Sequence, residues 1–426
     1  MHTYTGPSLN YKAIFTEAIT PFTITVDGDF LDVTRLKVSL TRFIDGVSLT
    51  DFADGPPTRI ARSVAAYWAD SYDWRKSEAS INSKLKQFTT VVQPSASPAN
   101  YTTSVSVHFV HHRSSRTDAI PLLFVHGWPG SFLEVEPIIR SLTDPPSETL
   151  PAFHVVAPSI PGYGFSPAPR APGFGYRAAG ATFHALMLKL GYEKYVFQGG
   201  DAGDLINRYA AHDFPNEVVS GLSNFWVIPP NDQDLERFRK NETSDDENYI
   251  IERLNSFFTH GWAYSQIQQT RPLKLATGMM DSPVGLAMWI YDSVAAGESD
   301  SELWTEEKII TWTMMHWING PYGAFSLYRN GAEDGAISTH GINMLPYVDQ
   351  PVAISQFPHD IWYRTPLDWA RRGGNVRQNT VHETGGHFAT LTSPDLLLDD
   401  IWRFFGDKEL SATHVFRDVG QDRPRD

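Results

Sequence analysis

The chain has 426 residues, and its hydrophobic content of 41% and aromatic content of 13% allow a large buried core. Its 35 Lys and Arg against 49 Asp and Glu give a formal net charge of −14, and no basic run favours binding to nucleic acid or to an anionic membrane. The chain has no cysteine, which excludes disulfides, thiolate chemistry and a cysteine-ligated metal. With no signal-peptide pattern and no apolar stretch of about 18 residues, we expect a cytoplasmic protein.

The first hundred residues contain few long periodic runs. Helices are predicted at residues 61–71 and 75–85, and a short loop rich in Pro and Ser follows at 93–98. We expect residues 1–100 to form an N-terminal arm that wraps around the rest of the chain and supports a lid.

From about Val105 the pattern alternates between strands and helices. In the helix predicted at residues 176–190, apolar side chains recur at i, i+3, i+4 and i+7. Alternation of this kind predicts an α/β fold with a mainly parallel sheet and helices on both faces, whose first part covers residues 101–228. The predicted strands in this part are 105–110, 120–125, 153–157, 195–198 and 218–222.

The alternation stops at Ile228-Pro229-Pro230. Residues 229–347 are helical in character and rich in Trp, Tyr and Met, and strands return at 351–355 and 376–381. A closing helix begins at Ser393-Pro394. We therefore predict a helical lid at 229–347, inserted into a sheet whose second part covers 348–426. Such an insert lies over the strand ends, where sites form in α/β folds.

A glycine-rich turn stands at the centre of the alternating region. Residues 199–203 (GGDAG) follow an apolar run at 195–197 and precede a helical pattern at 204–211. This is the frame of a nucleophile elbow, in which serine usually holds the central position. A carboxylate there suits displacement at a saturated carbon, so Asp201 favours alkyl electrophiles such as epoxides or haloalkanes. A plain turn with an N-cap aspartate gives the same local pattern.

A second glycine turn, FVHGWPGS at residues 124–131, also ends a strand. Backbone N–H groups at such a turn can bind a developing oxyanion. The N–H groups of Trp128 and of Ala202, the residue after the nucleophile, are the natural pair. A tight loop with an aromatic plug is the alternative interpretation.

A histidine close to the carboxyl end, His387 in TGGHFA, completes the order nucleophile, acid, base. Neutral imidazole suits the deprotonation of a water that hydrolyses an alkyl-enzyme ester. A loop histidine bonded to the backbone is the alternative. His382 and His387 are five residues apart, so they do not fit the i, i+4 spacing of an H-E-x-x-H metal site. Candidates for the acid that orients His387 are Asp349, Asp360, Asp368 and Glu383, and Asp360 is favoured because it follows a predicted strand.

Ring opening of an epoxide also needs a group that stabilises the departing oxygen. Tyrosine hydroxyls from a lid can do so, although most lid tyrosines only pack. Composition does not choose among the lid candidates Tyr249, Tyr264, Tyr291, Tyr322 and Tyr328.

Taken together, these motifs resemble those of the microsomal-type epoxide hydrolases, most closely the soluble fungal members of the Aspergillus type. The resemblance covers nearly the whole chain and includes HGWPGSF at 126–132, PSIPGYGFS at 158–166 and QGGDAGD at 198–204. It implies an α/β-hydrolase fold with an inserted lid and an N-terminal arm. Since the arm lacks the membrane anchor of the animal enzymes, the resemblance also implies a soluble protein.

The resemblance assigns roles to individual residues. It implies that Asp201 is the nucleophile, Asp360 the acid through FPHD and His387 the base through GGHFA. Tyr264 and Tyr328 match the two lid tyrosines. The chain departs from the family pattern at Ala202, where many relatives carry Trp, and in a segment before Tyr328 that is about one residue shorter, which leaves Tyr322 as a rival.

The resemblance implies an epoxide hydrolase that converts epoxides to vicinal diols through a covalent aspartyl glycol-ester intermediate. It requires neither a cofactor nor a metal, and its partners are the epoxide, water and, by resemblance only, a second copy in a homodimer. The aromatic-rich lid favours bulky apolar substrates such as aryl epoxides. The alternatives are a haloalkane dehalogenase, which Ala202 disfavours because it offers no side-chain halide donor, and a non-catalytic ligand-binding protein on the same fold.

Overall fold

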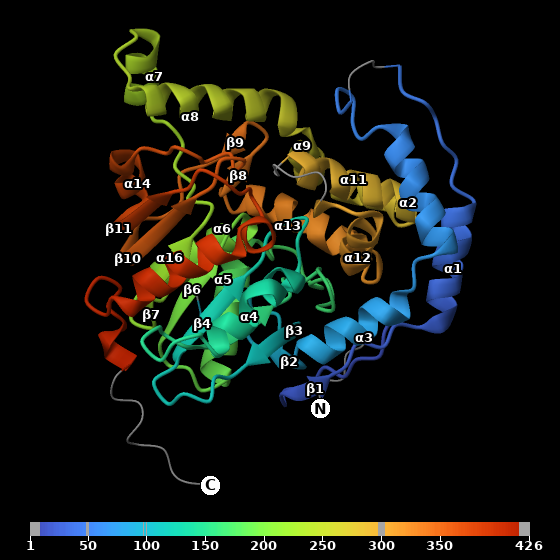
Figure 1. The fold of residues 1–426 in the computed structure, drawn as a ribbon, viewed down its shortest axis with the longest axis horizontal. Coiled ribbons are helices and arrows are strands. Elements are labelled where there is room, and N and C mark those ends of the chain that lie inside the picture. The colour runs from blue at the N-terminus through green and yellow to red at the C-terminus, as the bar shows by residue number, and fades with distance from the viewer. Residues whose placement is uncertain (1–8, 48–50, 97, 99, 297–302, 417–426) are drawn as a thin grey trace.

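The computed structural model describes residues 9–47, 51–96, 98, 100–296 and 303–416. Within these ranges a nine-stranded sheet runs through the molecule in the order β1-β2-β3-β5-β4-β6-β7-β10-β11 (Figure 1). The strands from β5 to β11 along this order pair in parallel, whereas β1, β2 and β3 join antiparallel at one side. The strands are β1 (Thr20–Phe22), β2 (Gln87–Val92), β3 (Val105–His112), β4 (Ile120–Val125), β5 (Phe153–Pro158), β6 (Tyr195–Gly199), β7 (Val218–Ser223), β10 (Val348–Gln356) and β11 (Gly374–Val381).

Helices cover both faces of this sheet. α4 (Glu136–Thr143) and α16 (Pro394–Gly406) pack together on one face, and α5 (Tyr176–Lys189) and α6 (Ala202–Asp213) pack on the other (Figure 1). The central strands β4, β5 and β6 are buried along their whole length, as expected for parallel strands covered on both sides. The predicted α/β architecture is therefore confirmed. Shorter elements on this body are α14 (Leu367–Gly373), α15 (Ala389–Thr392) and two 3-10 turns (Phe132–Val135 and Thr413–Phe416).

The N-terminal arm differs from the expectation because it is partly built into the sheet. Its strands β1 and β2 extend the sheet beyond β3, and its helices are α1 (Gly28–Ser39), α2 (Thr58–Asp70) and α3 (Trp74–Lys84). Sequence periodicity missed α1 because only Thr34 and Val38 are buried along it. β1 is too short to leave a period-two signal.

Residues 229–347, the expected lid, are mainly helical. Its helices are α7 (Asp232–Arg239), α8 (Asp245–Ser256), α9 (Ala263–Thr270), α10 (Pro272–Met279), α11 (Pro283–Ala296), α12 (Glu306–Trp317) and α13 (Tyr322–Glu333), with a π-helical turn (Phe257–Gly261) between α8 and α9. A small hairpin of β8 (Ile337–Ser338) and β9 (Gly341–Ile342) follows. In Figure 1 the lid occupies the upper part of the molecule, and the arm helix α2 packs against α11 and α12.

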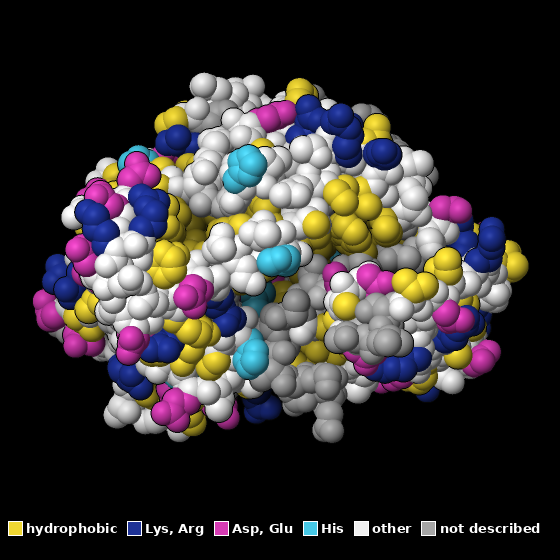
Figure 2. Space-filling view, turned by 90° about the horizontal axis from the view of Figure 1, so that it is seen from above, with side chains coloured by type: hydrophobic (Ala, Val, Ile, Leu, Met, Phe, Trp, Pro, Cys, Tyr) yellow, Lys and Arg dark blue, Asp and Glu magenta, His cyan; other side chains and the backbone are white. Residues whose placement is uncertain are grey.

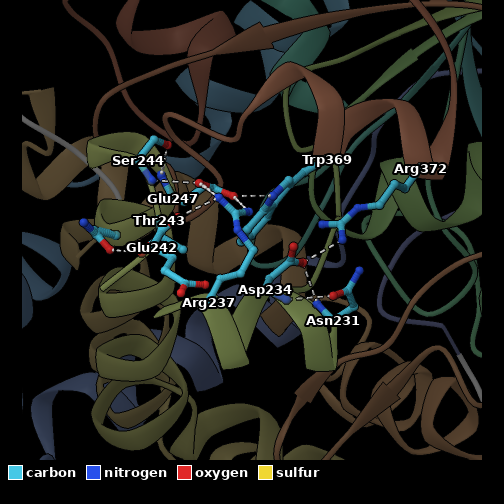
Figure 3. A network of polar contacts seen from close by, with 10 residues as sticks. Asn231, Asp234, Arg237, Glu242, Thr243, Ser244, Glu247, Trp369 and Arg372 are labelled. Atoms are coloured by element: carbon cyan, nitrogen blue, oxygen red, sulfur yellow. Dashed lines mark hydrogen bonds and ion pairs between the residues drawn. The ribbon is translucent and has the colours of Figure 1, made fainter. Parts of the chain in front are cut away.

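The first helices of the lid are tied to the sheet body by a polar network (Figure 3). Glu247 on α8 receives two hydrogen bonds from Arg237 and one from the indole of Trp369 on α14. Arg372, also on α14, donates to Asp234 on α7 at 2.6 Å. α7 and α8 are thereby fixed relative to the sheet. Among the described residues, no helix has both the length and the apolarity needed to cross a membrane.

Candidate active site

The turn between β6 and α6 holds Asp201 in a strained conformation. Its backbone has φ 50° and ψ −128°, in a region that side-chain-bearing residues rarely adopt. The glycines around it are needed for close approach: a Cβ on Gly203 would lie 2.0 Å from the carbonyl oxygen of Val125, and one on Gly127 would lie 2.4 Å from the Cβ of Asp201. The elbow therefore pushes the Asp201 carboxylate out of the turn and against the second glycine loop.

Two backbone donors hold this carboxylate. The N–H of Trp128 donates to Oδ1 of Asp201 at 2.8 Å, and the N–H of Ala202 also bonds the carboxylate. The buried carboxylate of Glu134 holds the Trp128 loop from behind by accepting the N–H of Gly127 at 3.3 Å. Burial raises the pKa of Asp201, while His387 and the two N–H groups counteract that rise.

His387 lies between Asp201 and a buried acid. Its Nδ1 is 2.7 Å from Oδ2 of Asp360, and its Nε2 is 3.8 Å from Oδ2 of Asp201. Asp360 is only 2% exposed, and the N–H of Trp362 donates to its other oxygen at 2.8 Å. The geometry therefore brings together the three residues that the sequence analysis put in the order nucleophile, acid and base. The rejected acids Asp349, Asp368 and Glu383 are all exposed.

Two lid tyrosines face this carboxylate. Tyr264 on α9 stacks on Trp128 with ring centroids 4.8 Å apart, and its hydroxyl is in hydrogen-bonding reach of Tyr328 on α13. Burial raises the pKa of both phenols above the usual value, and the nearby Asp201 raises it further. Both are therefore neutral hydroxyl donors near neutral pH. Tyr322 begins α13 and is 41% exposed, away from the cavity.

These groups line a cavity of about 730 Å³ between the sheet and the lid. Aromatic rings surround the reacting groups, with Trp128 against Tyr264 and Tyr328 and with Phe225 against His387. Figure 2 shows hydrophobic and histidine side chains gathered near the middle of the upper face, on the lid side of the molecule. The aromatic lining residues include Trp128, Tyr176, Phe225, Trp262, Tyr264, Tyr328 and Phe388. A cavity of this size can enclose a drug-sized ligand.

Several residues of the cavity wall were not predicted from the sequence. Phe52 reaches it from the N-terminal arm, Arg253 from α8 and Asp292 from α11. A helical signal existed for Arg253, since Arg253, Ser256, Phe257 and His260 recur at i, i+3, i+4 and i+7 and all line the cavity. Nothing in the sequence pairs Phe52 with the lid, because that contact depends on how the arm folds back.

Comparison with known proteins identifies the relatives of this chain. A family model described as the epoxide hydrolase N terminus matches residues 19–135, and one for the alpha/beta hydrolase fold matches residues 120–223. Juvenile hormone epoxide hydrolase 2 of Ctenocephalides felis is 30% identical over 95% of this chain and 89% of that protein. The chain belongs to the epoxide hydrolase family.

Solved structures agree with this membership. The structure of Aspergillus niger epoxide hydrolase aligns with a TM-score of 0.77 and 29% identity, covering 91% of this chain and 96% of that one. A further relative found by sequence, Epoxide hydrolase 1 of Sus scrofa, is 28% identical over 94% of this chain and 91% of that protein. The α/β-hydrolase fold and the assignment as a hydrolase, both expected from the sequence, are confirmed. In the part of this epoxide hydrolase that the structure describes, no three His, Asp or Glu side chains are grouped as metal ligands.

Proposed function

We propose that this epoxide hydrolase uses Asp201 as nucleophile, His387 as base, Asp360 as the acid that orients it, and Tyr264 and Tyr328 as donors to the epoxide oxygen. The observation that carries the proposal is that the two oxygens of Asp201 have different partners. Oδ1 already receives the N–H of Trp128 at 2.8 Å, whereas Oδ2 faces His387. One oxygen is thus occupied by the oxyanion hole, and the other is free to attack.

In the first step, Oδ2 attacks a ring carbon and the C–O bond of the epoxide breaks. The electron pair of that bond goes to the epoxide oxygen, which takes a proton from Tyr264 or Tyr328. Neutral phenols are suited to this task because burial keeps them protonated. The product is an ester between Asp201 and the glycol, with Oδ1 as its carbonyl oxygen.

In the second step, His387 removes a proton from a water that attacks the ester carbonyl carbon. The negative charge develops on Oδ1, which the N–H of Trp128 already binds, and the N–H of Ala202, which bonds the same carboxylate, is its second proposed donor. Asp360 accepts from Nδ1 of His387 and so leaves Nε2 as the base. Collapse of the intermediate breaks the bond between the carbonyl carbon and Oδ2, and the diol leaves with Oδ2, which takes the proton of the new Asp201 carboxyl. The water oxygen remains on Asp201, and the proton held by His387 returns through solvent to the tyrosine that protonated the epoxide oxygen.

For the substrate, we propose bulky apolar epoxides such as aryl epoxides. The support is the aromatic wall around Asp201, where Trp128 and Phe225 lie beside the reacting groups, and a cavity of about 730 Å³. The homodimer and the cytoplasmic location expected from the sequence, and the lack of a cofactor, stay predictions.

A single turnover in ¹⁸O-water tests the mechanism. Excess enzyme is mixed with styrene oxide, and the diol and the peptide that contains Asp201 are analysed by mass spectrometry. The proposal expects unlabelled diol and one ¹⁸O in the Asp201 side chain. A fully labelled diol would mean direct attack by water and would reduce Asp201 to a general base.

A further inference from the structure

The cavity wall contains one basic side chain, Arg253, and one acidic side chain, Asp292, that the proposed reaction does not use. Arg253 is the only Lys or Arg among the described residues that line the cavity. It lies on α8. The cavity is also lined by three residues that follow Arg253 at helical spacing, namely Ser256, Phe257 and His260. Its position is therefore part of the wall and not of the outer surface of the lid.

Among the described residues, none neutralises the charge of Arg253. Two other arginines nearby are neutralised, because Arg237 pairs with Glu247 and Arg364 pairs with Asp246. Within the described part of the chain, Arg253 has no carboxylate partner; its Nη1 donates to the hydroxyl of Tyr249 at 2.8 Å. A half-buried guanidinium without a counter-charge is costly unless something else binds it.

Part of this guanidinium is left unused by the described residues. With Nη1 bonded to Tyr249, neither Nε nor Nη2 has an acceptor among the described residues. Nε is buried, so Nη2 is the donor that a ligand can reach, and it can give a carboxylate a charge-assisted hydrogen bond. Aromatic contact with Tyr249, which also stacks with Arg364, keeps the guanidinium plane oriented.

The helix that carries Arg253 is also held in place. Glu247, six residues earlier on α8, closes a capping box with Ser244 and binds Arg237 and Trp369 (Figure 3). The opposite charge in the cavity, Asp292, belongs to α11, and its pKa is raised by burial alone with no contribution from Arg253. Arg253 and Asp292 therefore do not neutralise each other.

We propose that Arg253 is an anion subsite, and that the preferred substrates are epoxides that carry a carboxylate on the end remote from the ring. This inference rests on the proposed function and refines its substrate class. The aromatic wall near Asp201 binds the apolar part next to the epoxide, and Arg253 binds the acid. The cavity of about 730 Å³ leaves room for a chain between the two.

The test compares acids with their methyl esters at pH 8, where the acids are ionised. The probes are 5,6-epoxyhexanoate, 7,8-epoxyoctanoate and 10,11-epoxyundecanoate, each beside its ester, with styrene oxide as the uncharged reference. For at least one chain length the enzyme should show an acid-to-ester ratio in kcat/KM of about 10 or more, mainly through KM. A ratio of one or less at every length would overturn the proposal.

Variants identify the residue responsible. Arg253→Gln should bring the acid-to-ester ratio close to one, and Arg253→Lys should keep part of it because the charge remains without the guanidinium geometry. Arg239→Gln, on the exposed side of α7 and outside the cavity wall, removes the same charge and should keep the full ratio. An unchanged ratio in Arg253→Gln would also overturn the proposal. If Arg253→Gln does not fold, the proposal is still tested by the acid-to-ester ratio of the parent enzyme and by whether Arg253→Lys lowers that ratio. If the parent enzyme turns over none of these epoxides, styrene oxide included, the result would instead contradict the proposed function.

Discussion

At the scale of single residues, the chemistry depends on a carboxylate in an unfavourable place. Asp201 combines a positive φ with burial that raises its pKa. A raised pKa means that this group contributes stability below its unfolded pKa of about 3.8 and loses that contribution as the pH rises through its folded pKa. At neutral pH the ionised nucleophile therefore lowers the stability of the fold.

A variant without this charge should lose activity but keep its stability. Asp201→Asn is expected to lower turnover by at least about 10³-fold because the nucleophile is gone, while the melting temperature at pH 7 stays equal or rises. Asn tolerates positive φ and can still accept the N–H of Trp128. Thermal melts and epoxide turnover test this, with a mass measurement to show that the amide is intact. Asp349→Asn, at an exposed acid, should change neither quantity; a destabilised Asp201→Asn would contradict the argument.

The second lid tyrosine can be identified by a matched pair of variants. Tyr328→Phe should lower kcat/KM by about 10²-fold, because one donor to the epoxide oxygen is lost from the buried cavity. Tyr322→Phe removes the same hydroxyl from a side chain that is 41% exposed and should have no effect. Styrene oxide kinetics distinguish the two. Equal effects, or a larger effect at Tyr322, would refute the assignment of Tyr328.

At the scale of elements, the attachment of the lid depends on α8. Burial acts to raise the pKa of Glu247, but its bonds to Arg237 and Ser244 prevail and hold that pKa at about 2. A lowered carboxyl pKa contributes stability above the unfolded value of 4.5 that is lost as the pH falls toward 2. The junction between lid and sheet is therefore expected to weaken in acid.

Glu247→Gln should lower the free energy of unfolding by about 1–3 kcal/mol, because Arg237 and the indole of Trp369 lose a charged acceptor. The difference from the parent enzyme should shrink as the pH falls below 4.5. The control is Glu236→Gln, which breaks an exposed pair with Lys240 and should cost less than about 1 kcal/mol. Denaturant unfolding across this pH range measures both, and equal losses in the two variants would show that the network does not stabilise the junction.

Element positions were predictable wherever periodicity is strong. The strand predicted at 120–125 coincides with β4, and the helix predicted at 176–190 with α5. The elbow was predictable because its geometry is local to five residues. The choice between Tyr322 and Tyr328 was not, because it depends on which face of α13 lines the cavity. Arg253 and Phe52 were missed because a cavity wall joins segments that are far apart in the sequence.

At the scale of the whole molecule, the interior holds many histidines that stay neutral. Burial lowers the pKa of five of them to between about 3 and about 4, namely His108, His111, His126, His184 and His316. In the unfolded chain they take up protons below pH 6.5, so folding stability is full above that value and falls as the pH drops toward 4. Four carboxyls with raised pKa values, Asp201, Asp204, Asp292 and Asp334, act in the opposite sense but are fewer.

The enzyme should therefore be acid-labile well above the pKa of ordinary carboxyls. Each uncompensated histidine costs about 1.4 kcal/mol of unfolding free energy per pH unit. We expect the denaturant midpoint to be constant from pH 7 to 8 and to fall between pH 6 and 4.5. Unfolding curves at fixed ionic strength measure this. A flat midpoint down to pH 5 would show that the neutral histidines do not outweigh the carboxyls with raised pKa values.

The connection between β7 and β10 has a consequence for how activity returns after unfolding. The two strands are neighbours in the sheet, yet residues 224–347 lie between them in the chain. Closing so long a segment costs on the order of 4 kcal/mol of chain entropy, so this pairing is expected late in refolding. Asp360 and His387 both follow β10, whereas the elbow precedes the gap. Regained turnover therefore reports completion of the sheet, and it should lag behind the recovery of helical circular dichroism.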